Sequence, residues 1–317
     1  MTAELSRSRS GLRRILWLGL LGACLALAAA PAAAARVAVV LSDDSAPYQE
    51  VYQVIRASLD DTRNEARLVY AGNLTADSLI EARLAVGVGV RAAEALARLA
   101  DRPPVLAVLV PRAWYLKTGR ARLSDGGRRV ASAIYLDQPV EREARLIRVA
   151  LPEVRRVGVL LGADQAWLAA ELGEALRAQG LSLVQQTLPP DGRLIGPLET
   201  LLSGADLLLA VPDPQVINRN TAQSLFLTSY RYRVPVLGYS HSLTRAGALL
   251  SLHSSPAQIG RQTAEWVDSA LAGPAVHLPA PAYPAYSSAS VNEQVARSLG
   301  FTLPPEGELE KRLGGEH

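Results

Sequence analysis

The sequence is poor in cysteine, the residue that cross-links small folds. Among 317 residues there is one cysteine, Cys24, which excludes an intrachain disulfide and argues against a thiolate metal cluster. Aromatic residues make up only 5% of the chain. The 49% hydrophobic content is therefore mostly aliphatic, and it excludes a disordered or collagen-like chain. The length allows one large or two medium domains that are held together by burial.

An excess of charge of one sign is also missing once the N-terminus is set aside. An apolar run at residues 15–30 and the alanines of 32–35 follow four arginines, Arg7, Arg9, Arg13 and Arg14. This order is typical of a signal peptide, predicted here over residues 1–35. Its removal takes four of the 33 basic residues and one of the 30 acidic ones, which leaves 29 of each. A neutral mature chain lacks the basic stripe that a nucleic-acid partner requires.

Apolar runs long enough to span a bilayer are absent from the rest of the chain. The run at 15–30 is itself shorter than the roughly 20 residues of a spanning helix, so cleavage is favoured over a membrane anchor. Small residues at 21–23 precede Cys24, which keeps a lipoprotein as the minor alternative. In either case the sequence predicts export, to a bacterial periplasm.

From Arg36 onward, short continuous apolar runs alternate with amphipathic stretches. Continuous apolarity is typical of strands that are buried on both faces, as in parallel α/β sheets. The first series predicts strands at 37–41, 67–70, 84–90, 105–110 and 130–136. A second series predicts strands at 157–161, 183–187, 207–211 and 236–239. We therefore expect two doubly wound α/β lobes.

The last third continues the pattern with a strand at 248–253 and a helix whose start is well marked. Ser255 is the expected N-cap, Pro256 occupies the first turn, and Gln258 completes a capping box. A strand at 286–290 and a helix at 292–299 follow a proline-rich stretch. Residues 304–317 are expected to form a flexible tail.

In open parallel sheets, ligands bind at the carboxyl ends of the strands. Polar residues gather at those ends, in the segments 42–45, 111–114, 135–138, 162–165, 212–215 and 238–241. Charges beside proline turns need a partner when they are flanked by apolar residues. For Arg112 and Asp213, that partner is either another charge of the protein or a ligand.

Enzymatic motifs are missing. The four histidines show no metal-ligand spacing, and Gly238-Tyr239-Ser240-His241-Ser242 lacks the closing glycine of a nucleophile elbow. Gly87 and Gly89 resemble a fragment of a dinucleotide fingerprint, but no third glycine follows. The sequence thus predicts a binding protein with no cofactor and no metal, and catalysis is the minority interpretation.

Five segments together resemble the ABC-type substrate-binding proteins of the periplasmic type I class, and within it the branch of tryptophan- and tyrosine-binding transport components. They are VAVVLSDDSAPYQEVYQVI (37–55), LAVGVGVRAAEAL (84–96), LPEVRRVGVLLG (151–162), DLLLAVPDPQVIN (206–218) and PVLGYSHSLTRAGALLSLHSSPAQIGRQTAEWV (235–267). The final SVNEQVARSLG (290–300) fits the closing strand and helix of that family.

The resemblance implies a clamshell of two lobes that are joined by three crossing strands and close on a small molecule. The implied crossings fall near Asp137, near residues 241–246 and near Pro281. Sites of that family use the strand-end loops of both lobes, so the resemblance implies ligand contacts at Ser42, Asp43, Gly89, Arg112, Asp137, Asp213, Tyr239 and Ser240. The N-terminal lobe would then comprise 36–137 plus 246–281, and the C-terminal lobe 138–245 plus 282–303. The implied partner is the membrane permease of an ABC transporter, and a monomer is expected.

Two positions depart from the family pattern. The family often has an Asp-Pro pair after the fourth strand, where this chain has Val110-Pro111-Arg112, and an Asp-Asn pair after Pro212, where this chain has Asp213-Pro214. A zwitterionic ligand would suit both charges, with its carboxylate on Arg112 and its ammonium on Asp213. Tyr48, Trp114 or Tyr239 would cover its apolar part. The alternative function is a periplasmic regulator or outer-membrane partner on a locked bilobed scaffold.

Overall fold

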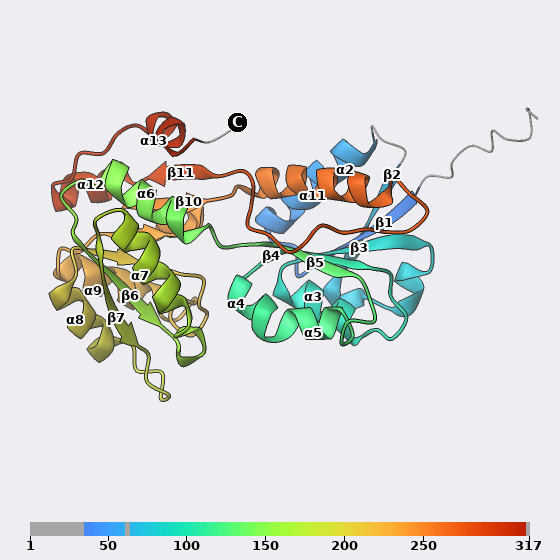
Figure 1. Ribbon diagram of the computed structural model, residues 1–317, viewed down its shortest axis with the longest axis horizontal. Helices are drawn as coiled ribbons and strands as arrows, with labels where there is room; N and C mark the ends of the chain where they lie inside the picture. Colours follow the sequence, from blue (N-terminus) through green and yellow to red (C-terminus); the bar gives the residue numbers. More distant parts are fainter. Residues whose placement is uncertain (1–34, 61–63, 315–317) are drawn as a thin grey trace, which may run out of the picture. The chain divides into compact units, whose positions relative to one another are not determined.

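The computed structural model describes residues 35–60 and 64–314. The predicted signal peptide and Cys24 lie outside these residues. Within them, no helix combines the length and the apolarity needed to cross a membrane. Two open sheets, each flanked by helices, form two α/β lobes, as the sequence predicted (Figure 1).

The first lobe contains a five-stranded, fully parallel sheet in the order β2-β1-β3-β4-β5. Its strands are β1 (Ala35–Leu41), β2 (Asn64–Tyr70), β3 (Ala82–Val88), β4 (Val105–Val110) and β5 (Ala131–Tyr135). Alternate side chains of a strand face opposite sides of a sheet. Val37, Val39 and Leu41 accordingly pack in one core cluster, and Ala38 and Val40 in another.

Helices cover both faces of this sheet. One face carries α2 (Ala46–Asp60) and α11 (Pro256–Leu271), and the other carries α3 (Val90–Arg98) and α5 (Arg120–Leu123). The short α4 (Arg112–Trp114) runs into a π-helical turn, Tyr115–Gly119, before α5. Two 3₁₀ turns, Ala71–Asn73 and Ala76–Leu79, connect β2 to β3. The expected start of α11 is confirmed, because Ser255 and Gln258 form the capping box.

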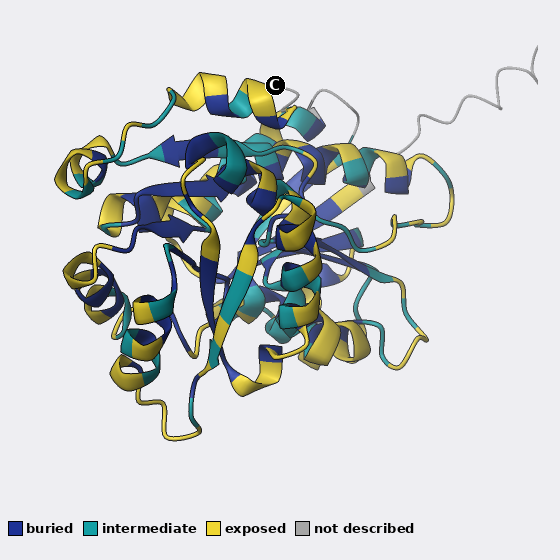
Figure 2. Cartoon of the chain, turned by 60° about the vertical axis from the view of Figure 1, so that its left-hand side comes forward, coloured by how far each residue is buried: buried dark blue, intermediate teal, exposed yellow. Residues whose placement is uncertain are grey.

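The second lobe contains a six-stranded sheet in the order β11-β10-β9-β8-β6-β7. Its strands are β6 (Arg156–Leu161), β7 (Ser182–Thr187), β8 (Leu207–Leu209), β9 (Val236–Gly238), β10 (Leu250–His253) and β11 (Ser288–Val291). All neighbours are parallel except β10 and β11. Figure 2 shows most strands buried, whereas the edge strand β7 is largely exposed or intermediate.

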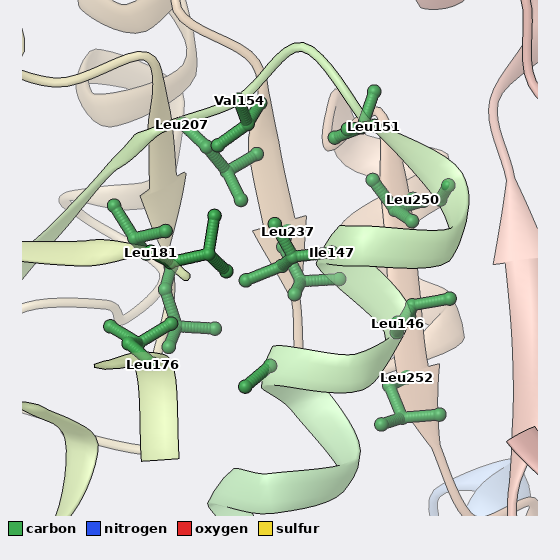
Figure 3. Packing of buried hydrophobic residues seen from close by; sticks show 14 of the residues in the cluster. Leu146, Ile147, Leu151, Val154, Leu176, Leu181, Leu207, Leu237, Leu250 and Leu252 are labelled. Carbon is green, nitrogen blue, oxygen red and sulfur yellow. The ribbon is translucent and has the colours of Figure 1, made fainter. Parts of the chain in front are cut away.

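One face of the second sheet packs against α6 (Val140–Ala150) and α7 (Leu168–Ala178), and the other against α8 (Ile195–Gly204) and α9 (Ala222–Arg231). Figure 3 shows Leu146 and Ile147 of α6 beside Leu237, Leu250 and Leu252 of the sheet. The remaining elements are a 3₁₀ turn (Ala163–Gln165), α10 (His241–Ala246), α12 (Glu293–Leu299) and α13 (Glu306–Leu313).

Two expectations about the C-terminal part need correction. Residues 306–313 form α13 instead of a flexible tail, because Leu309 and Leu313 are buried in the core of the second lobe. The range 246–281, expected in the first lobe, includes β10, which pairs with β9 and β11 of the second sheet. The chain therefore returns to the first lobe at Ser254 and Ser255, and not near residues 241–246.

The other two crossings lie close to their expected places. Residues 136–139 lead from β5 to α6, and residues 272–287 lead from α11 to β11. In the latter, Ala282 forms a bridge to Ile134 of β5. The three crossings are tied together by side chains: Gln138 Nε2 donates to Ser254 Oγ (2.9 Å), and Ser254 Oγ donates to the carbonyl of Tyr286 (2.6 Å). Arg142 donates to Gln138 Oε1 (2.7 Å).

Candidate ligand-binding cleft

A cavity of about 580 Å³ lies where the carboxyl ends of strands from both lobes meet. Parallel strands place their following loops at one edge of the sheet, so this is where an open α/β fold gathers polar groups. The first lobe contributes Ser42, Asp43, Tyr48, Val90, Arg91, Leu109, Pro111, Ala113, Trp114, Lys117, Thr118 and Leu136. The second lobe contributes Asp164, Gln165, Pro212, Asp213, Pro214, Gln215, Ile217 and Tyr239.

Ser42 organises the wall on the first-lobe side. Its hydroxyl donates to the carbonyl of Val88 (2.8 Å) and accepts from the backbone amide of Ala92 (3.0 Å). The end of β1 is thereby joined to the end of β3 and to the first turn of α3. Gly89 lies at this junction with φ +83°, and a Cβ there would lie 2.6 Å from Ser42 Oγ and 2.8 Å from the hydroxyl of Tyr48. Only glycine fits this position.

Asp43 follows Ser42 and is exposed. Its Oδ1 accepts a hydrogen bond from the backbone amide of Ser45 (3.0 Å). That hydrogen bond, with smaller contributions from the positive charges of Arg91 and Arg219, holds the pKa of Asp43 below its ordinary value despite some burial. Asp43 is therefore an anion at neutral pH, on the rim of the cleft beside α3.

The rest of the first-lobe wall has an unusual backbone. Leu109 has φ +54°, a conformation that non-glycine residues seldom adopt and that concentrates at binding sites. The wall continues with the π-helical turn Tyr115–Gly119, in which Lys117 and Thr118 line the cleft. Trp114 packs directly on Gly119, where a Cβ would lie 2.5 Å from the indole ring. The buried Nε1 of Trp114 has no hydrogen-bond partner among the described residues.

The wall on the second-lobe side is built around Asp213. This carboxylate is 2% exposed, and its Oδ2 and Oδ1 accept from the backbone amides of Gly162 (2.7 Å) and Gln215 (2.9 Å). Pro212 and Pro214 flank it, which restricts the backbone on both sides. Because Gly162 follows β6 and Asp213 follows β8, one carboxylate fixes two strand-end loops.

Tyr239 and Ser240 end the same wall. Tyr239 lines the cleft, and burial, with smaller contributions from Asp137 and Asp213, raises its pKa to about 12, so the phenol stays protonated. Ser240 is the N-cap of α10, where its hydroxyl accepts from the backbone amide of Leu243 (3.3 Å). The cleft thus combines a phenol, a fixed carboxylate and apolar surface.

Arg112 and Asp137 lie around a smaller adjoining cavity of about 20 Å³. Arg112 Nη1 contacts both carboxylate oxygens of Glu171 on α7, at 2.9 and 2.8 Å. Its backbone amide donates to Asp137 Oδ2 (2.7 Å). The sequence left open whether Arg112 pairs with another charged residue or with a ligand. In the structure its partner is a charged residue, Glu171.

Burial is the main influence on the acids of this smaller cavity. It raises the pKa of Asp137 to about 6, although the hydrogen bond from Arg112 acts in the opposite direction. Glu143 of α6 is buried as well, and its pKa lies well above the ordinary value because of desolvation and the neighbouring Asp137. These carboxyl groups therefore hold protons more tightly than exposed ones.

Sequence reasoning missed three residues around Arg112: Trp167 and Tyr283, which line this cavity, and Glu171, which contacts the guanidinium. They come from α7, from the turn before it and from the third crossing, so their sequence neighbourhoods do not connect them with Arg112. The signal that could have drawn attention to Tyr283 is that it is the aromatic residue of the proline-rich run 274–284.

None of the histidines that the structure describes, His241, His253 and His277, lines the cleft. His241 Nδ1 is 3.0 Å from Ser290 Oγ, and His253 Nδ1 is 3.2 Å from Ser251 Oγ, at the junction of α10, β10 and β11. Burial lowers the pKa of His253 to about 4, so this ring is neutral. Within the described part of the chain, no group of three or more His, Cys, Asp or Glu side chains is arranged to hold a metal ion.

Solved structures with a similar fold come from several bacteria. One, from Streptococcus pneumoniae, is described as an ABC domain in complex with L-Trp (16% identity, TM-score 0.61, 88% of this chain and 98% of that one). Another is a conserved domain protein from Vibrio cholerae (22%, 0.61, 88% and 98%). A third is the ligand-free, open form of a substrate-binding protein with adhesive properties from Clostridium difficile (14%, 0.62, 85% and 96%). At these identities they show the fold alone.

No curated protein matches the chain. The family model described as ABC transporter substrate binding protein matches residues 65–308, which is well over half of the chain and includes strand-end loops of both lobes. This family is non-catalytic, is typically extracellular or periplasmic, and implies a small-molecule ligand and a membrane transporter as partner. The chain belongs to the ABC transporter substrate binding protein family.

Proposed function

We propose that this protein is the exported, monomeric solute-binding component of an ABC-type importer, and that it captures a small polar metabolite such as an amino acid in the cleft. The observation that carries the proposal is the 580 Å³ cavity lined by strand-end loops of both lobes. Such a volume falls within the range of small-molecule sites, and the lining mixes apolar surface with a few placed polar groups, as such sites do.

The charges on the cleft wall favour a zwitterion. Asp213 is a buried carboxylate whose oxygens can each accept a further hydrogen bond, so it suits an ammonium group. Because Arg112 already pairs with Glu171, the carboxylate of the ligand needs another cationic side chain. Arg91 lines the cleft in the first turn of α3, where helix amides and the helix dipole also favour an anion.

The apolar part of the ligand has aromatic neighbours on both sides. Tyr48 and Trp114 come from the first lobe, and Tyr239 comes from the second. Ser42 and Gly89 shape the wall next to Arg91, and Asp43 adds an anion to the rim. In this proposal Ser42, Asp43, Gly89, Asp213 and Tyr239 surround the ligand, Arg112 and Asp137 act at the joint between the lobes, and Ser240 supports α10.

The test is calorimetric titration with each of the twenty L-amino acids, preceded by native mass spectrometry of the gently purified protein to detect a small molecule that it carries. We expect at least one amino acid to bind at micromolar or tighter affinity. Asp213→Asn and Arg91→Gln should each weaken it at least tenfold, since each removes a charge-assisted hydrogen bond.

Arg98→Gln is the matched control, because Arg98 is an exposed arginine at the other end of α3. It should leave the affinity unchanged. If no amino acid binds, the ligand class is wrong; if the Asp213 and Arg91 variants bind as well as the parent, the assigned site is wrong.

A further inference from the structure

Arg112 joins the two lobes beside the cleft. It follows β4 in the first lobe, and its guanidinium contacts Glu171 of the second lobe at 2.8 Å. The guanidinium also lies over two rings, 5.0 Å from the centroid of Trp167 and 5.4 Å from that of Tyr283. Arginine stacks favourably on aromatic faces while it pairs with a carboxylate. We call Arg112, Glu171, Trp167 and Tyr283 the interlobe latch.

The latch has one half in each lobe. Tyr283 belongs to the third crossing, but its ring packs edge-on against Tyr135 of β5, with centroids 5.6 Å apart, which attaches it to the first lobe. Its hydroxyl donates to Glu171 Oε1 (3.3 Å). Arg112 and Tyr283 therefore grip Glu171 and Trp167, and separation of the lobes would break these contacts together.

The latch differs from an ordinary surface ion pair. The two arginines differ: the Arg112 side chain is 22% exposed, whereas that of Arg231, which pairs with Glu199 inside the second lobe, is 67% exposed; the acids, Glu171 and Glu199, are 32% and 33% exposed. Partial burial reduces solvent screening, and the stacked rings restrict the arginine, so less entropy is lost in forming the pair. A second interlobe pair, Lys117 with Asp164 (2.5 Å), lies on the same two segments of the chain.

The latch is also connected to a crossing. The backbone amide of Arg112 donates to Asp137, which lies in the first crossing, 136–139. Arg112 is thus held at its backbone by the joint and at its side chain by the opposite lobe.

We propose that Arg112 is a positioning residue, which through the interlobe latch sets the balance between an open and a closed arrangement of the lobes. The consequence for transport rests on the proposed function: a ligand that binds the closed form has an apparent Kd equal to the intrinsic value divided by the closed fraction. The latch would then tune affinity without touching the ligand.

The distance between the lobes tests this directly. Residues 36–317 contain no cysteine, so the full-length Cys24→Ser chain accepts two labels, at Gln53→Cys on α2 and Gln223→Cys on α9. Both positions are exposed, one in each lobe. Pulsed electron spin resonance of the ligand-free protein then gives the distribution of interlobe distances. We expect Arg112→Ala to lower the closed-to-open ratio about tenfold, the effect of losing one charged hydrogen bond.

A double-mutant cycle makes the result specific. Glu171→Gln removes the charge, keeps the side-chain shape and leaves Arg112 in place, so it tests the same contact if Arg112→Ala does not fold. Each single variant should open the lobes, and the double variant should open them no further than Arg112→Ala alone, because that variant already loses the contact with Glu171. Arg231→Ala, which breaks an ion pair within one lobe, is the matched control and should leave the distribution unchanged.

The proposal is overturned if Glu171→Gln leaves the distances as they are, if the two single effects add, or if Arg231→Ala shifts them equally. Because these distances are measured without ligand, that failure leaves solute binding intact. Conversely, a shifted distribution together with no binding of the twenty L-amino acids would sustain the latch and remove the proposed ligand class.

Discussion

The two walls of the cleft are built on opposite principles. The first-lobe wall contains Leu109 and Gly89 at positive φ, a π-helical turn and an indole N–H that has no partner in the described part of the chain. In the second-lobe wall, Pro212 and Pro214 flank a carboxylate whose two oxygens each accept a backbone amide. The first wall thus contains one strained residue, Leu109, and a donor that has no partner among the described residues, whereas the carboxylate of the second wall has its hydrogen bonds made. We therefore expect the first wall to rearrange when a ligand binds, and the second wall to keep its conformation.

Gly89→Ala tests the strained wall and has the largest expected effect. A Cβ at φ +83° would overlap Ser42 and Tyr48, so either the first turn of α3 or the end of β1 must move. We expect a loss of about 3 kcal/mol in the free energy of unfolding, measured by urea denaturation. Gly72→Ala is the control, because a Cβ there meets nothing within 4 Å. Equal losses at both glycines would show that the junction is not strained.

Asp213→Ala tests the satisfied wall and should cost somewhat less. It leaves the amides of Gly162 and Gln215 without their acceptor, and we expect about 2 kcal/mol of destabilisation in the same denaturation experiment. Asp213→Asn retains one acceptor oxygen and should recover part of the loss. A variant as stable as the parent would contradict the view that this carboxylate fixes two loops.

Trp114→Phe has the smallest expected effect and separates the two walls most sharply. It removes the indole N–H that has no partner among the described residues and keeps an aromatic ring on Gly119. Because an unsatisfied buried donor is lost along with some packing, we expect a change within about 1 kcal/mol of zero. A thermal melt that falls by ten degrees or more would mean that this N–H is satisfied, and the contrast between the walls would fail.

The parts of the fold that depend on local sequence could be predicted, and the parts that depend on distant partners could not. The continuous apolarity of 37–41 predicted β1, and the capping box formed by Ser255 and Gln258 predicted the start of α11. In contrast, α13 was expected to be a flexible tail, because the few apolar residues of a short charged segment do not reveal that Leu309 and Leu313 have a core to enter.

The same limit applies to the site. Strand ends located the cleft residues Ser42, Asp43, Asp213 and Tyr239, since topology alone brings such ends together. The partner of Arg112 lies 59 residues away on a helix of the other lobe, and no periodicity marks which face of that helix meets the first lobe. Charge at a strand end therefore predicted that Arg112 needs a partner, but not which one.

The position of α11 has a consequence for biosynthesis. This helix covers a face of the first sheet, yet it is encoded after nearly all of the second lobe; its Gly260 lies against Val51 and Val54 of α2. A nascent chain that ends before residue 256 therefore has α2 on that face of the sheet but lacks α11. The first lobe is therefore complete only after residues 256–271 have been synthesised, when most of the second lobe already exists.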